Sequence, residues 1–241
     1  MNRRTEFNQV YFDHIQKREI VLCPDARERI GAFFCLLSEE NQRFNLTGYK
    51  NVGDFVDYHL LDTMTLLRNL EIPTRAIVTD VGSGAGVPGL LLKLLRPDLN
   101  LILIESIKKK ASFLEKAARE FHLSDCVVLC DRAENLAHQI PYREKSDLVT
   151  ARALASLSVT LELTAGFVRL GKELALFLGS EDALSAQNEK VAETLGCCRQ
   201  KNIPYTLPNR EQRFYIAVFH KISLTPELYP RKPGQIKKRP L

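Results

Sequence analysis

The stretch VTDVGSGAGVPGLLLKLL, residues 78–95, contains the feature that decides the fold. An apolar run ends at Asp80, glycines follow at positions 82, 84, 86 and 89, and an apolar segment begins after Pro88. A strand that passes through a glycine-rich turn into a helix opens a βαβ unit, and the N–H groups of the helix N-terminus attract anionic groups. The stretch therefore predicts a ligand-binding loop at the edge of a parallel sheet.

From residue 76 onward, short apolar strands alternate with helical segments. Strands are predicted at 76–81, 100–105, 126–130, 147–152, 173–178 and 213–221, and helices at 88–95, 107–121, 133–139, 156–168 and 182–195. Near-continuous apolar strands separated by helices are typical of a mostly parallel sheet covered on both faces. The predicted fold class is therefore α/β, a doubly wound Rossmann-like sheet whose ligand lies beyond the carboxyl ends of the strands.

The sequence before residue 76 has the hydrophobic pattern of helices without strands between them. Residues 27–41 have a helical apolar face, and apolar positions at 52, 56, 60, 63, 67 and 70 recur close to the helical period. A polar segment ending at Gly48 predicts a turn between them. We therefore expect residues 1–75 to form a helical extension packed on a core of residues 76–228, followed by a tail at 229–241.

The tail carries the excess charge of the chain. The net charge is +5, and residues 229–241 hold five basic side chains and no acid, which leaves the rest neutral. These residues are Arg231, Lys232, Lys237, Lys238 and Arg239. A proline- and lysine-rich segment builds no core of its own, so we expect it to be extended or to adapt to a partner. A phosphate-binding arm and a solubilising tail are both open interpretations.

Several classes of protein are disfavoured. No apolar run reaches the 18 residues of a membrane span, and the N-terminus lacks the apolar region of a secretory signal. The six cysteines form no CxxC pair and no metal-ligand spacing with histidine, which predicts free thiols in a reducing compartment and no metal site. We expect a cytoplasmic monomer that binds neither metal nor membrane.

The glycine loop does not fit a phosphate-bearing cofactor. Counted from Gly82, the first glycine after the strand, a dinucleotide loop requires its third glycine where Val87 stands. A P-loop requires a Lys-Ser or Lys-Thr pair that is missing here. The helix N-terminus suits a carboxylate equally well, so Gly82, Ser83, Gly84, Gly86 and Val87 are candidate contacts for a ligand of another kind.

Acidic residues end successive predicted strands. Asp80 precedes the loop and could hold an ammonium group, and Glu105 ends the second strand, where an acid accepts the hydroxyls of a ribose. The segment DRAEN, residues 131–135, follows the third strand and could border an adenine. Each acid taken singly could merely cap an element. Together, sites for ammonium, carboxylate, ribose and adenine without phosphate predict S-adenosylmethionine.

The motifs also resemble a known family. The segments NLTGYK, HLLDTM, DVGSGAGVPGLLL, RAENL, TARALASL and YPRKPGQIKKRPL are similar to those of the RsmG (GidB) methyltransferases, over residues 40–240. The resemblance implies transfer of a methyl group from S-adenosylmethionine to N7 of a guanine in small-subunit (16S) ribosomal RNA, as naked RNA or in the 30S particle. It implies cofactor contacts at Gly82, Val87, Ala133, Glu134 and Arg152. Family members commonly have Phe or Leu at the position of Val87.

The sequence lacks the motifs of two other classes of methyltransferase, which agrees with methylation at N7. The Asn/Asp-Pro-Pro-aromatic motif of amine methyltransferases is replaced by TARALAS, residues 150–156, and no Pro-Cys pair offers a nucleophile. Guanine N7 has a free lone pair, so the reaction needs alignment rather than a general base. Arg152 is the predicted active-site residue, to hold the carboxylate of the cofactor or to orient the base. A structural arginine is the alternative.

Other candidates keep two interpretations each. His59 and Asp62 lie one helical turn apart, and His59 is either a core histidine or part of an RNA cleft. Lys108 and Lys110 begin a helix and either face solvent or contact phosphate. A methyltransferase acting on a small molecule or a protein is the alternative function, and a nucleotide-binding oxidoreductase and a pure RNA-binding module are weaker ones.

Overall fold

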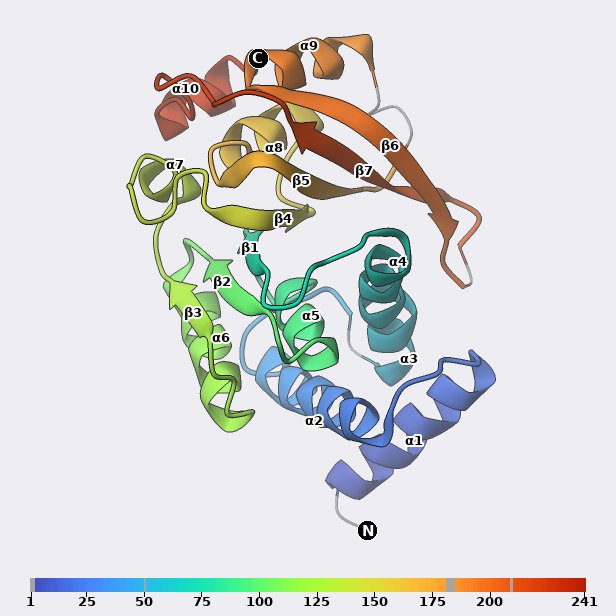
Figure 1. The fold of residues 1–241 in the computed structure, drawn as a ribbon. Helices are drawn as coiled ribbons and strands as arrows, with labels where there is room; N and C mark the ends of the chain where they lie inside the picture. The colour runs from blue at the N-terminus through green and yellow to red at the C-terminus, as the bar shows by residue number, and fades with distance from the viewer. Residues whose placement is uncertain (1–2, 50, 181–184, 209) are drawn as a thin grey trace.

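The computed structural model describes residues 3–49, 51–180, 185–208 and 210–241, and its centre is a seven-stranded sheet (Figure 1). The strand order is β3-β2-β1-β4-β5-β7-β6. The strands are β1 (Ile77–Val81), β2 (Asn100–Ile104), β3 (Cys126–Leu129), β4 (Ser146–Arg152), β5 (Val168–Leu178), β6 (Cys197–Thr206) and β7 (Arg213–Lys221). The first five are parallel, and β7 is antiparallel to β5 and β6. The predicted fold class is confirmed.

Strand β6 was not predicted, and β5 begins at Val168 rather than at residue 173. β6 lies at the edge of the sheet and reads CCRQKNIPYT, in which polar residues and a proline hide the strand pattern. An edge strand tolerates both, because one side of its backbone forms no ladder. A register shift between Arg199 and Lys201 further breaks the alternation of side chains.

Helices cover both faces of the sheet (Figure 1). They are α5 (Gly89–Leu95), α6 (Lys108–Glu120), α7 (Ala133–Leu136), α8 (Leu157–Thr164), α9 (Ala186–Thr194) and α10 (Pro233–Lys238). Alternate residues of β5 enter two different cores: Ala175 and Phe177 belong to one, and Leu174 and Leu176 to the other. The helix predicted at 182–195 begins at Ala186 after its cap Ser185; residues 181–184 lie outside the described residues.

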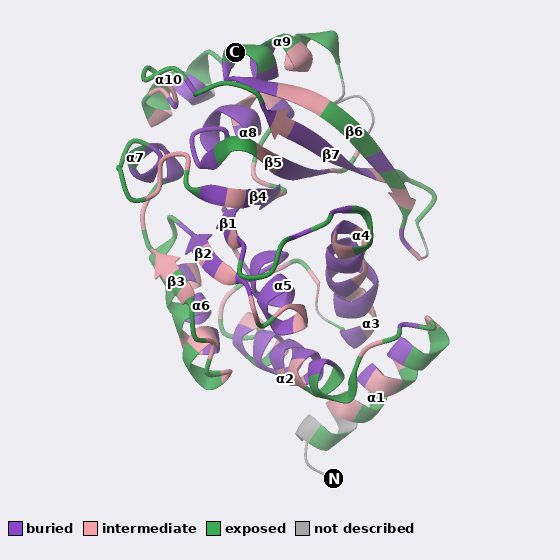
Figure 2. Ribbon diagram, viewed as in Figure 1, coloured by how far each residue is buried: buried purple, intermediate pink, exposed green. Residues whose placement is uncertain are grey.

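The N-terminal helices share a core with the sheet, and Figure 2 colours parts of α2 and of the neighbouring α5 as buried. They are α1 (Arg3–Lys17), α2 (Pro24–Asn41), α3 (Val52–Asp54), the π-helix η1 (Phe55–Leu60) and α4 (Leu61–Asn69). Phe33 of α2 lies 6.4 Å from Phe113 of α6, ring to ring. A Cβ at Gly31 would lie 2.8 Å from the ring of Tyr11, so this glycine allows α1 and α2 to pack closely.

The helical pattern of residues 52–70 is interrupted by η1, whose six residues are all buried. A π turn contains about one residue more than an α turn, so it changes which side chains share a face, and such turns are frequent at functional sites. In this chain, η1 and α4 bring His59 and Asp62 together against the end of β4. The regular period predicted from the sequence did not include this turn.

The tail is not extended, contrary to the expectation from its composition. Residues 233–238 form α10, and Ile236 is buried in the core beside α8. Arg231 donates to both carboxylate oxygens of Glu162, at 2.7 and 2.6 Å, and its backbone N–H donates to the same group. Glu162 is fully buried. The tail therefore docks through a buried ion pair and through apolar side chains, among them Ile236, Tyr229 and Leu241.

None of the described helices has both the length and the apolar character needed to cross a bilayer. All six cysteines lie in the described part of the chain, and none of them forms a disulfide bond.

Candidate active site

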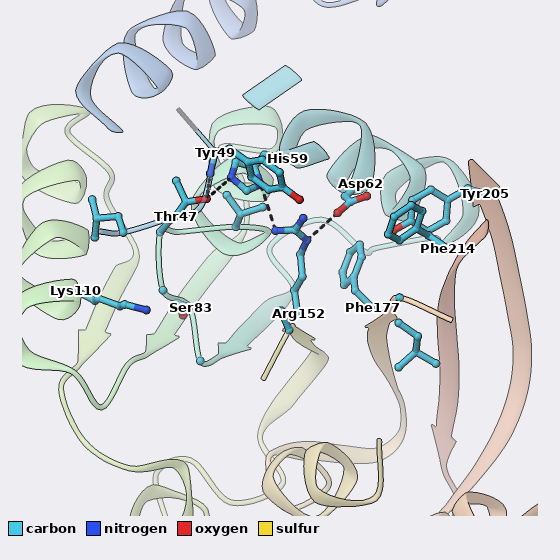
Figure 3. A pocket seen from close by; sticks show the side chains of 18 residues that line it. Thr47, Tyr49, His59, Asp62, Ser83, Lys110, Arg152, Phe177, Tyr205 and Phe214 are labelled. Atoms are coloured by element: carbon cyan, nitrogen blue, oxygen red, sulfur yellow. Dashed lines mark hydrogen bonds and ion pairs between the residues drawn. The ribbon is translucent and has the colours of Figure 1, made fainter. Parts of the chain in front are cut away.

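A cavity of about 420 Å³ lies at the carboxyl ends of the central strands (Figure 3). This volume falls in the range of small-molecule sites, about 300–1,000 Å³. Its walls come from the glycine loop, the end of β4, the ends of β5, β6 and β7, and the segment before α3. The lining residues are Leu46, Thr47, Tyr49, His59, Asp62, Gly82, Ser83, Gly84, Ala85, Val87, Lys110, Arg152, Ala153, Phe177, Leu178, Gly179, Tyr205 and Phe214. Seven predicted site residues are among them.

The glycine loop is shaped by left-handed backbone. Gly82, Gly84 and Gly86 have φ values of 73°, 53° and 84°, a conformation that costs other residues about 1–2 kcal/mol. At Gly86 a Cβ would also lie 2.5 Å from the Leu90 side chain in the first turn of α5. The loop can therefore turn back on the sheet and expose backbone to the cavity only with glycine at these positions.

Asp80 lies behind the loop and does not line the cavity. Its Oδ1 accepts from the Thr150 hydroxyl at 2.7 Å, and its Oδ2 accepts from the Gly89 N–H at 3.2 Å. Burial raises the pKa of Asp80 to about 6, and the hydrogen bond from Thr150 is the largest influence that opposes the rise. With both oxygens partnered inside the protein, Asp80 supports the loop and the start of α5 instead of facing an ammonium group directly.

Glu105 joins the end of β2 to the loop. Its Oε2 accepts from the Gly84 N–H at 2.9 Å, and its Oε1 accepts from the Ile107 N–H at 2.7 Å. Each carboxylate oxygen can accept more than one hydrogen bond, so the group keeps acceptor capacity for the hydroxyls of a ribose. The carboxylate is thus fixed by backbone on both sides, at the strand end where the sequence places it.

Ala133 and Glu134 begin α7, after β3, and both are buried. Glu134 accepts from Arg132 at 2.7 Å. Neither residue lines the cavity around Arg152. The structure leaves them on the β2–β3 side of the site, where the sequence predicts contacts with an adenine.

Arg152, at the end of β4, is held by three groups from the helical region, and Figure 3 shows two of them, His59 and Asp62. Its Nε donates to Asp62 Oδ2 at 2.7 Å, its Nη1 to His59 Nδ1 at 3.2 Å, and its Nη2 to the Tyr58 carbonyl at 3.2 Å. A guanidinium has five N–H donors, so one donor on each Nη remains for a ligand. The N-terminal helices therefore aim a preorganised cation into the cavity.

Burial shifts the pKa values of His59 and Asp62 in opposite directions beside this cation. Burial, and then the charge of Arg152, lower the pKa of His59 well below its usual value, so the ring is neutral. Because Nδ1 accepts from Arg152, the proton resides on Nε2, which donates to Thr47 Oγ1 at 3.3 Å. Burial raises the pKa of Asp62, while Arg152 and the Tyr205 hydroxyl oppose that rise. His59 is thus both a buried histidine and part of the cavity wall.

One wall of the cavity depends on Asn41, which the sequence analysis did not identify. Its Oδ1 accepts from the N–H groups of Leu46 and Thr47 at 2.8 and 3.0 Å, and its Nδ2 donates to the Tyr49 carbonyl at 3.0 Å. A single amide therefore fixes the segment that carries three lining side chains. The polar character of this segment predicted a turn but not its place in the site.

A second missed feature is a set of three aromatic rings from the ends of neighbouring strands. Phe177 is the last residue but one of β5, Tyr205 lies near the end of β6, and Phe214 lies near the start of β7. The Tyr205 and Phe214 rings are 5.8 Å apart and inclined by 32°. We call these three residues the aromatic wall. Their positions 28 and 9 residues apart carry no motif, so only the pairing of the strands brings them together.

The predicted RNA contacts divide into three groups. Lys110 lines the cavity, and Lys108 is exposed at the start of α6. Lys232, Lys238 and Arg239 are exposed on the tail, and the side chain of Lys237 lies outside the described part of the chain. Arg231 is the exception, since its guanidinium is bound to Glu162. The interpretation of Arg231 as a phosphate contact is therefore replaced by a structural one.

The donor set of the cavity fits S-adenosylmethionine. Two free guanidinium donors on Arg152 and the backbone of the glycine loop suit a carboxylate. Glu105 does not line this cavity, but it bonds the Gly84 N–H of the loop and keeps acceptor capacity for a ribose. No phosphate-binding lysine follows the loop. When bound, S-adenosylmethionine supplies an electrophilic methyl group on a sulfonium.

Comparison with known proteins identifies the family. A family model described as GidB, rRNA small subunit methyltransferase G, matches residues 26–213. A ribosomal RNA small subunit methyltransferase G from Carboxydothermus hydrogenoformans is 39% identical, covering 87% of this chain and 89% of its own. A protein of the same name from Moorella thermoacetica is 38% identical, covering 92% and 93%. A SAM dependent methyltransferase from Aquifex aeolicus shares the fold, with 13% identity, a TM-score of 0.52 and coverage of 69% and 92%. The resemblance inferred from the sequence is confirmed: the chain belongs to the GidB family of rRNA small subunit methyltransferases G.

Proposed function

We propose that this protein transfers the methyl group of S-adenosylmethionine to N7 of a guanine in small-subunit ribosomal RNA. Membership of the methyltransferase G family supports the enzyme class, the cofactor and the RNA substrate. The observation that carries the proposal is the cavity itself, in which the glycine loop and Arg152 face each other at the strand ends.

N7 is supported as the acceptor atom because its methylation requires no general base, and because the one histidine among the described residues of the cavity wall is occupied in holding Arg152. Attack by the N7 lone pair on the methyl carbon forms one N–C bond as the C–S bond breaks, and the positive charge passes from sulfur to the base. No proton leaves the acceptor, so no general base is needed. The neutral ring of His59 is held between Arg152 and Thr47, and so serves to orient Arg152.

Alignment is then the main task of the protein. Arg152 and the loop hold the cofactor, and with it the methyl group and the sulfur that must align with N7. The three groups bonded to Arg152 limit the movement of its side chain. Orientation of reacting groups can supply several kcal/mol of the barrier reduction. Arg152 is therefore a positioning cation, and the remaining cavity space beside it receives the base.

Binding of RNA is assigned to basic residues around the mouth and on the tail. Lys110 lies in the cavity wall, and Lys108, Lys232, Lys238 and Arg239 are exposed and free to meet phosphates. We also propose that the enzyme acts in the cytoplasm as a monomer, without a metal ion. A small molecule or a protein as the methyl acceptor is the alternative.

The test is methyl transfer from labelled S-adenosylmethionine to small-subunit particles from cells that lack this gene, followed by digestion to nucleosides. We expect the label in 7-methylguanosine. Label in another nucleoside would retain the enzyme class and reject N7. No label in RNA, with cofactor binding still measurable, would favour the alternative acceptors.

A further inference from the structure

We propose that the aromatic wall, Phe177, Tyr205 and Phe214, is a stacking site for the acceptor guanine, extruded from the RNA into the cavity. This inference rests on the proposed function and adds where and how the base is held. The three rings line the same cavity as Arg152 and the glycine loop.

The wall lies on the acceptor side of the site because of the strand order. The loop after β1, Glu105 after β2 and α7 after β3 occupy one half of the sheet, and β5, β7 and β6 form the other half. Ligands of such sheets bind across the point where the strand order reverses, here between β1 and β4. A cofactor that uses the β1–β3 half leaves the β5–β7 half free for the second reactant.

The rings are incompletely covered by protein. Tyr205 and Phe214 are half-buried, and Phe177 is 8% exposed, with these surfaces meeting at the cavity. Figure 3 shows Phe177, Tyr205 and Phe214 gathered on one side of Arg152, with Ser83 and Lys110 on the other side. Apolar ring surface facing a polar site is available to stack a flat, aromatic ligand.

The chemistry of the substrate calls for such a surface. A guanine within a helix is stacked on its neighbours, and enzymes that modify bases take the base out of the stack and hold it between aromatic or apolar side chains. A wall of rings replaces part of the lost stacking. It also orients the plane of the purine, which keeps the in-plane lone pair of N7 within that plane.

The test compares ring removal at the wall with the same change elsewhere. Leucine keeps the side chain apolar and removes the ring, so we use Phe214→Leu and Tyr205→Leu, with Phe12→Leu as the matched control. Phe12 lies on α1, where its ring faces Arg27. For each variant we measure S-adenosylmethionine affinity, thermal stability and kcat/KM with small-subunit particles that lack the methyl group.

We expect each wall variant to lower kcat/KM for particles by about 5- to 150-fold, the range that corresponds to the loss of one base–aromatic stack. Cofactor affinity of Phe214→Leu should stay within about twofold of the wild-type value, and Phe12→Leu should transfer methyl groups normally. Wild-type kcat/KM in both wall variants, with 7-methylguanosine still formed, would overturn the stacking site alone. Absence of 7-methylguanosine from the wild-type reaction would instead reject the proposed function.

Photocrosslinking locates the contact independently of activity. A p-benzoylphenylalanine in place of Phe214 should crosslink to the nucleotide that the wild-type enzyme methylates, or to its immediate neighbours. The same group in place of Phe12 should not. Crosslinks from position 214 that map only to distant nucleotides would contradict the proposal even if activity falls.

Discussion

The two halves of the site are built in different ways. The half at β1, β2 and β3 is made mainly of backbone, a loop of left-handed glycines. Glu105 accepts from the N–H of Gly84 in the loop, and Asp80 accepts from the N–H of Gly89 at the start of α5. The half at β4, β5, β7 and β6 is made of side chains, Arg152 and the aromatic wall, held by residues far away in the sequence. The first depends on local conformation and the second on tertiary packing.

This difference predicts different consequences of mutation. Backbone features fail through strain and should disturb cofactor binding and folding together. Mutation of the side chains removes an interaction partner. We therefore expect such variants to change stability, cofactor affinity and methyl transfer to different extents. The following variants test the comparison, in order of decreasing expected effect.

Arg152→Ala should have the largest effect. We expect methyl transfer to fall by about 100-fold or more because positioning is lost, and stability to fall by ~3–5 kcal/mol because Asp62 remains buried without its counter-charge. Single-turnover assays and urea unfolding measure the two effects. Adding Asp62→Asn should restore part of the stability but not the activity. Methyl transfer by Arg152→Ala at close to the wild-type rate would contradict the role of Arg152 in positioning the reactants.

Gly86→Ala tests the backbone half against a matched position. Gly86 and Gly171 have φ values of 84° and 76°, but only Gly86 faces a nearby side chain, Leu90. We expect Gly171→Ala to cost ~1–2 kcal/mol with normal cofactor affinity. Gly86→Ala should cost more and weaken S-adenosylmethionine binding by about tenfold, measured by calorimetry. Equal effects of the two changes would mean that the loop conformation has no part in binding.

Asp80→Asn should change the dependence of stability on pH. The folded protein binds a proton at Asp80 with a pKa of about 6, above the usual value of 3.8, so it holds more protons than the unfolded chain between these values. The resulting stabilisation is complete below about pH 4 and is lost as pH rises through 6, by ~3 kcal/mol. Denaturation series at pH 4 to 7 should show this decline in wild type and a flatter profile in Asp80→Asn. Parallel profiles would show that Asp80 is not the titrating group.

The tail should give the smallest effect. Deleting the tail would also leave Glu162 without its partner Arg231 and so lower stability. Point variants are therefore needed to test the surface charge of the tail alone. We expect Lys238→Ala with Arg239→Ala to weaken binding to small-subunit particles a few-fold and to reduce its salt dependence, with unchanged cofactor affinity. If the double variant and the wild type give the same binding curves at two salt concentrations, these two residues do not contact the RNA.

The contrast also explains which parts could be predicted. The loop, the acid at Glu105 and the parallel strands follow local patterns, so the sequence was sufficient for them. Arg152 was found because its strand end could be placed, but its partners Asp62 and His59 depend on a π turn with no sequence signal that we recognised. Tyr205 lies on an edge strand whose polar residues concealed it, so the wall required the tertiary structure.

The docking of residue 231 has a consequence for truncated forms of the protein. In a chain that ends before residue 231, residues 77–221 can still pair their strands. The Glu162 carboxylate of α8 then has no cation beside it, and burying it is unfavourable. A prematurely terminated chain would thus keep α8 loosely attached and open to proteases. Only chains elongated past this arginine would reach full resistance to degradation.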